Sequence, residues 1–233
     1  MMTSTAESLR TPASVHERIR HKIVRNEIPP GRRVNIDSLA RELGVSQTPI
    51  REALHRLEGE NLVIRERGRG YATTELLTEA QLQHMFEVRM LLEPWACRVV
   101  AVDRAGNPGP ALLTLVDEFE SEHADVCARI DLAAHDTEFH TLIHASTANE
   151  FLSRSLAGLH AQANLFRLYG HDIDSVSTLT EHRDVAQAIA DCDGSAAEEA
   201  MRTHLLRSLD RYLPALRGEA SNDFVAPPPA RIR

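Results

Sequence analysis

Hydrophobic residues recur every three or four positions along most of the 233-residue chain, which is the spacing of helices that bury one face. Two short runs of this kind follow each other near the N-terminus. Leu39 and Leu43 lie four positions apart in the first run, and Ile50 and Leu54 lie four apart in the second. Gly44 lies between the runs and is suited to the positive φ that ends a helix. The pattern therefore predicts two helices joined by a tight turn.

Capping residues mark the expected starts of these and later helices. Asn35 precedes the first helix and Ser46 precedes the second, and both residue types accept hydrogen bonds from free backbone amides. Further along, Thr178 with Glu181 three positions later has the spacing of a capping box. We therefore expect helices to begin after Asn35, Ser46 and Thr178.

A short arginine-rich hairpin is predicted directly after the second helix. The apolar stretch Leu62–Ile64 leads into alternating arginines, a turn containing Gly68 and Gly70, and the returning stretch Tyr71–Thr73. A helix, a turn, a second helix and a basic hairpin form the pattern of a winged helix-turn-helix, which reads duplex DNA. A helix-turn-helix can also serve as a protein-interaction module, and this alternative remains open here.

The rest of the chain carries helical spacing and turn signals with no second hairpin. We expect helices at about 78–103, 109–129, 131–147, 149–169, 177–192 and 195–214. The predicted fold class is mainly α: an N-terminal winged helix-turn-helix with a small β-hairpin wing, followed by a C-terminal antiparallel all-α helical bundle.

The expected domain organisation follows from these elements. Residues 1–13 are predicted to be a disordered tail, and residues 14–75 a DNA-binding domain that begins with an amphipathic helix. Residues 76–217 are predicted to form an effector-binding and dimerisation domain, and residues 218–233 a second disordered tail.

Charge is distributed unevenly between the two predicted domains. The net charge of the chain is −8, but residues 14–75 contain 12 Arg and Lys against 9 Asp and Glu. Residues 76–233 contain 13 against 24, so the acidic excess is C-terminal. Attraction to phosphate is therefore expected only at the N-terminal domain.

Composition narrows the class of protein further. The chain has 42% hydrophobic and 26% charged residues, no apolar stretch of membrane-spanning length, and a polar N-terminus. Its three cysteines are widely spaced, which argues against a disulfide framework. We expect a cytoplasmic protein without a membrane span.

Candidate DNA contacts lie on the polar face of the second helix, in the loop before the first helix and in the wing. Thr48 and Arg51 are placed to meet base edges or phosphates. Arg32 and Arg33 are either phosphate contacts or simply solvated charge. The full predicted set is Arg32, Arg33, Ser46, Gln47, Thr48, Arg51, His55, Arg56, Arg67, Gly68 and Arg69.

The stretch LGVSxTPxREALxRLExExLV, followed by RGRGY, resembles the DNA-binding domain of the GntR family of bacterial transcription regulators. The resemblance implies a DNA-binding, winged helix-turn-helix regulator of transcription. That family most often has Arg at the position of Gln47, so this departure puts the operator sequence in doubt but not the fold.

Four polar residues fall on the apolar stripes of the predicted bundle. At 100° per residue, Asp136 and His140 share a face with Phe139, and His182 and His204 lie on the inner faces of two later helices. A carboxylate and three imidazoles are costly to bury unpaired, and one divalent metal ion satisfies all four. This donor set suits Zn²⁺, with Ni²⁺, Mn²⁺ or Fe²⁺ as alternatives.

The pattern DxxFH at residues 136–140, followed by EHxxxxxAIxxxDxxxAxxxMxxHL from Glu181, is similar to the FCD ligand-binding domain of the FadR-type branch of the GntR family. Many members of that branch bind a metal through one Asp and three His, and these positions fall on Asp136, His140, His182 and His204. His144, one turn after His140, is the most plausible false candidate.

Two arginines on apolar stripes are candidates for binding an effector. An inward guanidinium requires an anion, which for Arg89 is either an effector carboxylate or the side chain of Glu93. Arg167 has the same two interpretations. The resemblance adds Asn164, where the family often has a basic residue, so Asn164 is expected to hydrogen-bond the effector.

The sequence therefore predicts a homodimer that binds a pseudo-palindromic operator in double-stranded DNA. A small-molecule carboxylate effector bound at the metal controls this binding. The resemblance implies repression. Two alternatives are a metal-dependent enzyme that carries a DNA-binding domain and a regulator that senses the metal itself.

Overall fold

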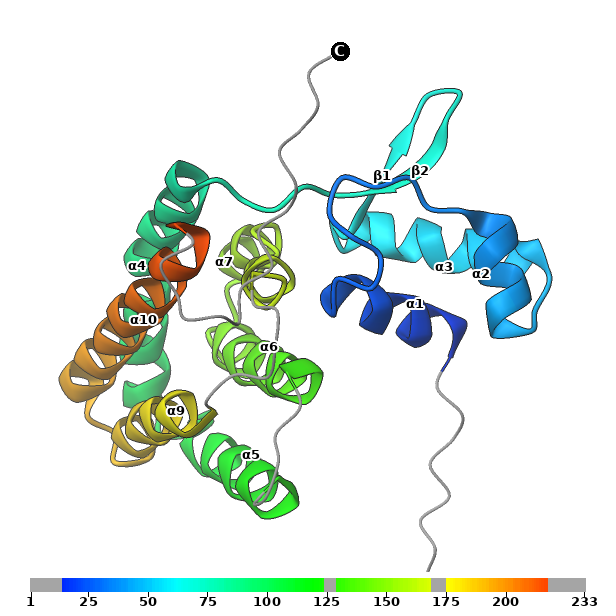
Figure 1. Ribbon diagram of the computed structural model, residues 1–233. Helices are drawn as coiled ribbons and strands as arrows, with labels where there is room; N and C mark the ends of the chain where they lie inside the picture. Colours follow the sequence, from blue (N-terminus) through cyan, green and yellow to red (C-terminus); the bar gives the residue numbers. More distant parts are fainter. Residues whose placement is uncertain (1–13, 124–128, 169–174, 218–233) are drawn as a thin grey trace, which may run out of the picture. The chain divides into compact units, whose positions relative to one another are not determined.

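The computed structural model describes residues 14–123, 129–168 and 175–217. The predicted tails, residues 1–13 and 218–233, lie outside these described residues. The chain divides into two compact units between Thr74 and Glu75. The N-terminal unit contains α1 (Val15–Val24), α2 (Ile36–Leu43), α3 (Gln47–Gly59), β1 (Val63–Glu66) and β2 (Gly70–Thr73) (Figure 1).

The turn between α2 and α3 forms as the sequence predicts. The side chain of Asn35 accepts a hydrogen bond from the backbone N–H of Ser38 at 3.0 Å, and Gly44 has a φ of 69°. Ser46 is the N-cap residue of α3, so the helix begins where expected, but the expected capping hydrogen bond from its side chain is not formed. The helices are held instead by buried apolar side chains, among them Ile50 and Leu54.

The wing is a two-stranded antiparallel hairpin whose register pairs Val63 with Thr73 and Glu66 with Gly70. Gly70 has a φ of 89°, a conformation that few other residues adopt. Arg33 forms an isolated bridge to the returning strand at Ala72, so the loop before α2 is tied to the wing.

The described residues of the C-terminal unit form helices joined by turns and loops, with no strand among them. Its helices are α4 (Glu79–Val102), α5 (Gly109–Glu122), α6 (Arg129–Ser146), α7 (Glu150–Ala157), α8 (Ala161–Leu165), α9 (Ser175–Ala190) and α10 (Gly194–Arg217). The long helices α4 and α10 lie side by side, and α9 packs on α10 (Figure 1). The mainly α fold class is therefore confirmed.

Three predicted helices differ from the structure. The helix expected at 109–129 ends at Glu122, as α5. The expected helix at 149–169 is two helices, because the chain breaks after α7 and His160 adopts a positive φ of 47°. The expected cap at Thr178 lies inside α9, which already runs from Ser175. This shift places Glu181 in the second turn of α9, where its carboxylate faces α10 rather than a backbone amide.

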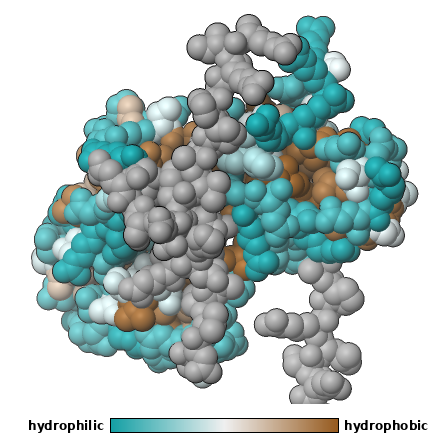
Figure 2. All heavy atoms as spheres, in the orientation of Figure 1, coloured by the Kyte–Doolittle hydropathy of each residue, from teal (hydrophilic) through white to brown (hydrophobic). Residues whose placement is uncertain are grey.

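On the face shown in Figure 2, hydrophilic residues predominate and hydrophobic residues form scattered groups. None of the described helices combines the length and the hydropathy needed to cross a membrane.

Candidate metal centre and nucleic-acid interface

Three helices of the C-terminal unit bring one carboxylate and three imidazoles together. Asp136 and His140 are one turn apart on α6, His182 comes from α9 and His204 from α10. All four are buried, and one ligand atom from each lies within 4.8 Å of the others. The four residues predicted as metal ligands therefore form a single cluster, which we call the metal centre.

The Nδ1 nitrogen of each imidazole in the metal centre lies close to a polar side chain. Nδ1 of His140 lies 2.7 Å from Oε2 of Glu93, and Nδ1 of His204 lies 2.9 Å from Oε2 of Glu181. A carboxylate that accepts the Nδ1 proton leaves Nε2 as the nitrogen with a free lone pair. The hydrogen bond to Glu181 therefore sets His204 in the tautomer that a metal ligand needs, whereas Nδ1 of His140 is close to Glu93 without a hydrogen bond to it.

The third imidazole, His182, has a histidine as its neighbour. Its Nδ1 lies 3.1 Å from Nε2 of His135, a buried residue that the sequence analysis did not select. Nε2 of His182 is buried and has no hydrogen-bond partner, although Oδ1 of Asp136 lies 3.4 Å away. A buried nitrogen left in this state is costly unless something binds it, so this atom fits a metal site.

The pKa shifts of residues in the cluster also fit a metal site. Burial lowers the pKa of His182 to about 3, although Asp136 acts in the opposite direction. Burial likewise lowers the pKa of His204, with Glu181 opposing it. Burial alone would raise the pKa of Asp136, but His140, His182 and Arg89 offset this effect and hold it well below its usual range. Neutral imidazoles and an ionised carboxylate are the forms that bind a divalent metal.

A buried ion pair adjoins the metal centre. Nε of Arg89 lies 2.5 Å from Oε1 of Glu93, and both side chains are 2% exposed. Arg89 therefore forms the ion pair with Glu93 that was one of its two predicted roles. Nη2 of Arg89 also lies 3.4 Å from Nε2 of His140, so the guanidinium reaches the edge of the centre.

His144 lies farther out than the four ligands. Its Nε2 is 3.8 Å from Oε2 of Glu93, and it joins Glu93 and His140 in a second grouping with metal-ligand spacing. Because that carboxylate is already paired with Arg89, the first cluster is the better metal site.

The other two predicted effector residues are buried in α8 and just after it. The amide of Asn164 donates to the backbone carbonyl of Leu159 at 3.2 Å. Burial lowers the pKa of Arg167 to about 10, with Glu75 partly opposing the shift. An effector role for either residue stays a prediction.

A small cavity of about 10 Å³ lies against the metal centre, with Asp136 and His204 in its wall. This volume holds about one water molecule. The cavity is lined by Leu132, Asp136, Phe166, Thr178, His204, Ser208, Arg211 and Tyr212. Sequence reasoning missed Ser208, Arg211 and Tyr212, although they follow His204 at helical spacing on α10. Arg89, Asn164 and Arg167 are absent from this lining.

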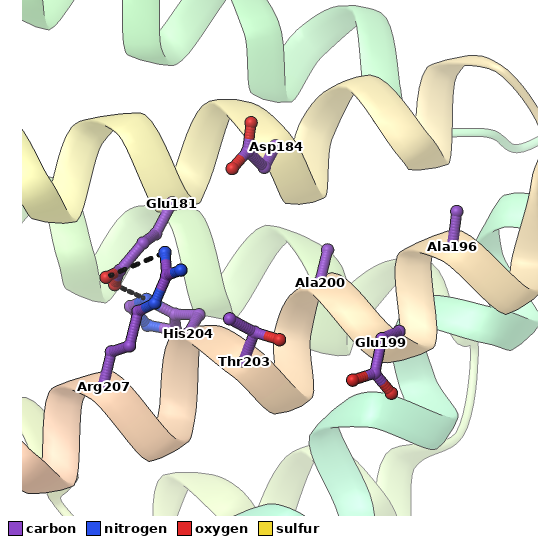
Figure 3. Close-up of a pocket in the computed structure, with 8 residues that line it drawn as sticks. All are labelled: Glu181, Asp184, Ala196, Glu199, Ala200, Thr203, His204 and Arg207. Atoms are coloured by element: carbon purple, nitrogen blue, oxygen red, sulfur yellow. Dashed lines mark hydrogen bonds and ion pairs between the residues drawn. The ribbon is translucent and has the colours of Figure 1, made fainter.

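A larger hollow of about 340 Å³ opens on the outer side of α9 and α10. Figure 3 shows Glu181 from α9 pointing across this hollow toward His204 and Arg207 of α10. His204 therefore connects the metal centre to a surface depression.

The predicted DNA contacts lie in the N-terminal unit, and all eleven residues are exposed. Gln47 donates to Oδ1 of Asp37 at 2.5 Å and accepts from Nη2 of Arg51 at 3.2 Å. The face of α3 opposite the buried Ile50 and Leu54 is therefore free to approach a major groove.

Comparison with known proteins identifies the class. Residues 11–72 match the family described as bacterial regulatory proteins, gntR family, and residues 84–207 match the FCD domain. The chain therefore belongs to the GntR family of bacterial transcription regulators, in the branch with a C-terminal FCD domain.

Two relatives named as regulators of operons are similar to the chain along most of their length. The chain is 28% identical over 197 residues to the Nta operon transcriptional regulator of Aminobacter aminovorans, covering 84% of this chain and 91% of the relative. It is 29% identical over 208 residues to a probable D-xylose utilization operon transcriptional repressor of Paenarthrobacter nicotinovorans, covering 87% of each. The crystal structure of a putative transcriptional regulator GntR from Rhodococcus sp. RHA1 shares the fold, with a TM-score of 0.63, 20% identity and coverage of 86% and 96%.

Proposed function

We propose that this protein is a homodimeric transcriptional repressor whose operator binding is controlled by a small organic acid at a metal centre. The observation that carries the proposal is the metal centre itself, in which Nε2 of His182 is buried without a partner. The FCD match and the relative named as a repressor support it.

The N-terminal unit is the proposed DNA-binding part. In this proposal α3 enters the major groove and the arginines of the wing contact the backbone or a minor groove. In a dimer, the N-terminal unit of each copy reads one half of a pseudo-palindromic operator. The exposure of all eleven predicted contacts supports this arrangement.

The proposed cofactor is a divalent metal ion, with Zn²⁺ the best match to one carboxylate and three imidazoles. When bound, the ion supplies a Lewis acid to which carboxylate oxygens bind. Asp136 and the Arg89–Glu93 pair together carry one negative charge, so a divalent ion leaves the centre with net positive charge. This balance favours an anionic effector.

A second copy of the chain is the proposed dimer partner. Leu91, Trp95 and Val102 recur on one face of α4 and are 76%, 46% and 62% exposed. Leu206 of the neighbouring helix α10 is 50% exposed. Apolar side chains at helical spacing on two packed helices suit a symmetric interface.

One observation favours a second candidate function. The cavity beside the metal centre holds about one water molecule, so the structure as it stands suits sensing of the metal itself. Operator affinity that follows free metal without any organic acid would support this version.

The test is metal analysis of untagged protein combined with thermal shifts against a panel of carboxylic acids. Wild type is compared with the double variant His140→Ala, His182→Ala. We expect stoichiometric metal in wild type only, and acid stabilisation that disappears with the metal. Equal acid shifts in both proteins would overturn the proposed site.

A further inference from the structure

An ion pair between α9 and α10 has the geometry of carboxylate recognition. Nη1 of Arg211 lies 2.7 Å from Oε1 of Glu181, and Nη2 lies 2.8 Å from Oε2. Two parallel N–H···O bonds of this kind are the usual way in which an arginine binds a carboxylate. Arg211 thus already holds a carboxylate that belongs to the protein.

This pair occupies the wall between the metal centre and the surface. Arg211 lines the inner cavity together with Asp136 and His204. Glu181 lines the hollow of about 340 Å³ shown in Figure 3, and both residues line a second surface hollow of about 490 Å³. Separation of Glu181 from Arg211 would join the inner and outer spaces.

The inner cavity must enlarge before any organic acid enters. Its 10 Å³ accommodates about one water molecule, whereas acetate already has four non-hydrogen atoms. Two ion pairs border this region. The Arg89–Glu93 pair is 2% exposed on both sides, so water and other ions do not replace a lost partner there. In the second pair Glu181 is 5% exposed but Arg211 is 28% exposed, so water reaches the guanidinium and the pair opens at lower cost on that side.

We propose that Arg211 binds the carboxylate of the effector by exchanging it for the carboxylate of Glu181, and that this exchange opens the route to the metal centre. The inference rests on the proposed function and assigns a residue to its effector. Arg211 keeps two charge-assisted hydrogen bonds throughout the exchange. Glu181 keeps Nδ1 of His204 at 2.9 Å and has Nη1 of Arg207 at 4.0 Å as a replacement cation.

The lining defines the chemical class of the effector. Thr178, Ser208 and Tyr212, which carry hydroxyl groups, line the cavity together with the apolar residues Leu132 and Phe166. Hydroxyl groups in the wall of a site favour ligands that can hydrogen-bond to them. The effector class is therefore a small carboxylic acid that carries a hydroxyl group.

The test measures acid binding to the zinc-loaded, full-length chain by calorimetry. The probes are two pairs that differ by one hydroxyl group, glycolate against acetate and malate against succinate. The variants are Arg211→Met, Arg211→Lys and Glu181→Gln. Arg202→Met is the matched control, because Arg202 is a partly exposed arginine on the same helix that pairs with Glu198. Zinc content is measured for every variant.

We expect Arg211→Met to weaken binding of the hydroxy acid by about 10- to 100-fold at unchanged zinc content, as for loss of a charge-assisted pair. Arg211→Lys is expected to lie between Arg211→Met and wild type, because lysine keeps the charge but not the bidentate geometry. Glu181→Gln is expected to bind more tightly, since the competing charge is gone. Arg202→Met should behave as wild type.

The outcomes separate the two proposals. Wild-type affinity in both Arg211 variants would overturn the exchange and leave the metal-bound acid intact. A zinc-loaded wild type that binds none of the four acids would count against the proposed function and this inference together. Equal affinity for glycolate and acetate, and for malate and succinate, would overturn the assigned effector class.

Discussion

The two units of this chain use charged residues in opposite ways. In the N-terminal unit the polar residues selected for function are exposed, and the buried core is apolar apart from Thr73 and Thr74. In the C-terminal unit the selected residues are buried, and each metal-centre histidine has a polar neighbour behind it. A surface that meets a large polyanion needs no internal network, whereas a site that holds a small ion must be built inside the fold.

The largest effect is expected from a variant that disrupts the metal centre itself. The double variant His140→Ala, His182→Ala removes two of four donor groups, so its metal content should fall to a small fraction of the wild-type value. Metal analysis by mass spectrometry measures this directly. His84→Ala is the control, because His84 is exposed on α4 and should leave metal content unchanged. Full metal retention in the double variant would show that the ion lies elsewhere.

The second effect concerns the buried pair beside the centre. Arg89→Met leaves the carboxylate of Glu93 without its guanidinium in a site that is 2% exposed. Loss of one partner of a buried pair costs about 3–5 kcal/mol. Urea unfolding followed by the fluorescence of Trp95, the single tryptophan of the chain, reports on the C-terminal unit. The double variant Arg89→Met, Glu93→Leu should regain much of the loss, and an Arg89→Met variant as stable as wild type would rule out a structural pair.

The third effect concerns the exposed face of α3 and should leave the C-terminal helical bundle unchanged. Arg51→Ala is expected to weaken operator binding by about 1–3 kcal/mol, which corresponds to about 5- to 150-fold. Fluorescence anisotropy on a duplex from the gene's own upstream region measures the affinity. Metal content and Trp95 fluorescence should match wild type. Arg98→Ala, an exposed arginine of α4, serves as the control and should bind DNA normally.

The smallest expected effect is confined to a helix end of the N-terminal unit. Asn35→Ala removes the hydrogen bond from the Ser38 amide and should cost about 1 kcal/mol. Thermal melting followed by circular dichroism should show a small shift in the transition of this unit only. A shift of the Trp95 transition instead would mean that the two units do not unfold independently.

The same contrast between the two units explains which features could be predicted from the sequence. The turn at Gly44 and the wing at Gly68 and Gly70 are encoded by neighbouring residues, so the sequence predicts them well. Asp136 and His140 were recognised because one turn of helix places both on an apolar stripe. The break before α8 was not predicted, because it depends on a positive φ at His160, which a histidine in the sequence does not indicate.

The neighbours of the metal centre could not be derived in this way. Glu93 lies 47 positions before His140, and His135 lies 47 positions before His182, so their contacts depend on how helices align in three dimensions. Glu181 was assigned to a helix cap, whereas it binds Arg211 30 positions later. Periodicity shows which side of a helix is buried, but not which residue of another helix it meets.

The central claim is that the metal-bound acid controls the DNA-binding unit. The most direct test is operator affinity of the metal-loaded and the metal-free protein, each with and without the acid that stabilises wild type best. We predict that the acid weakens operator binding about 5- to 150-fold in the metal-loaded protein and has no effect without metal. An acid effect of equal size in both forms, or none in either, would contradict the account.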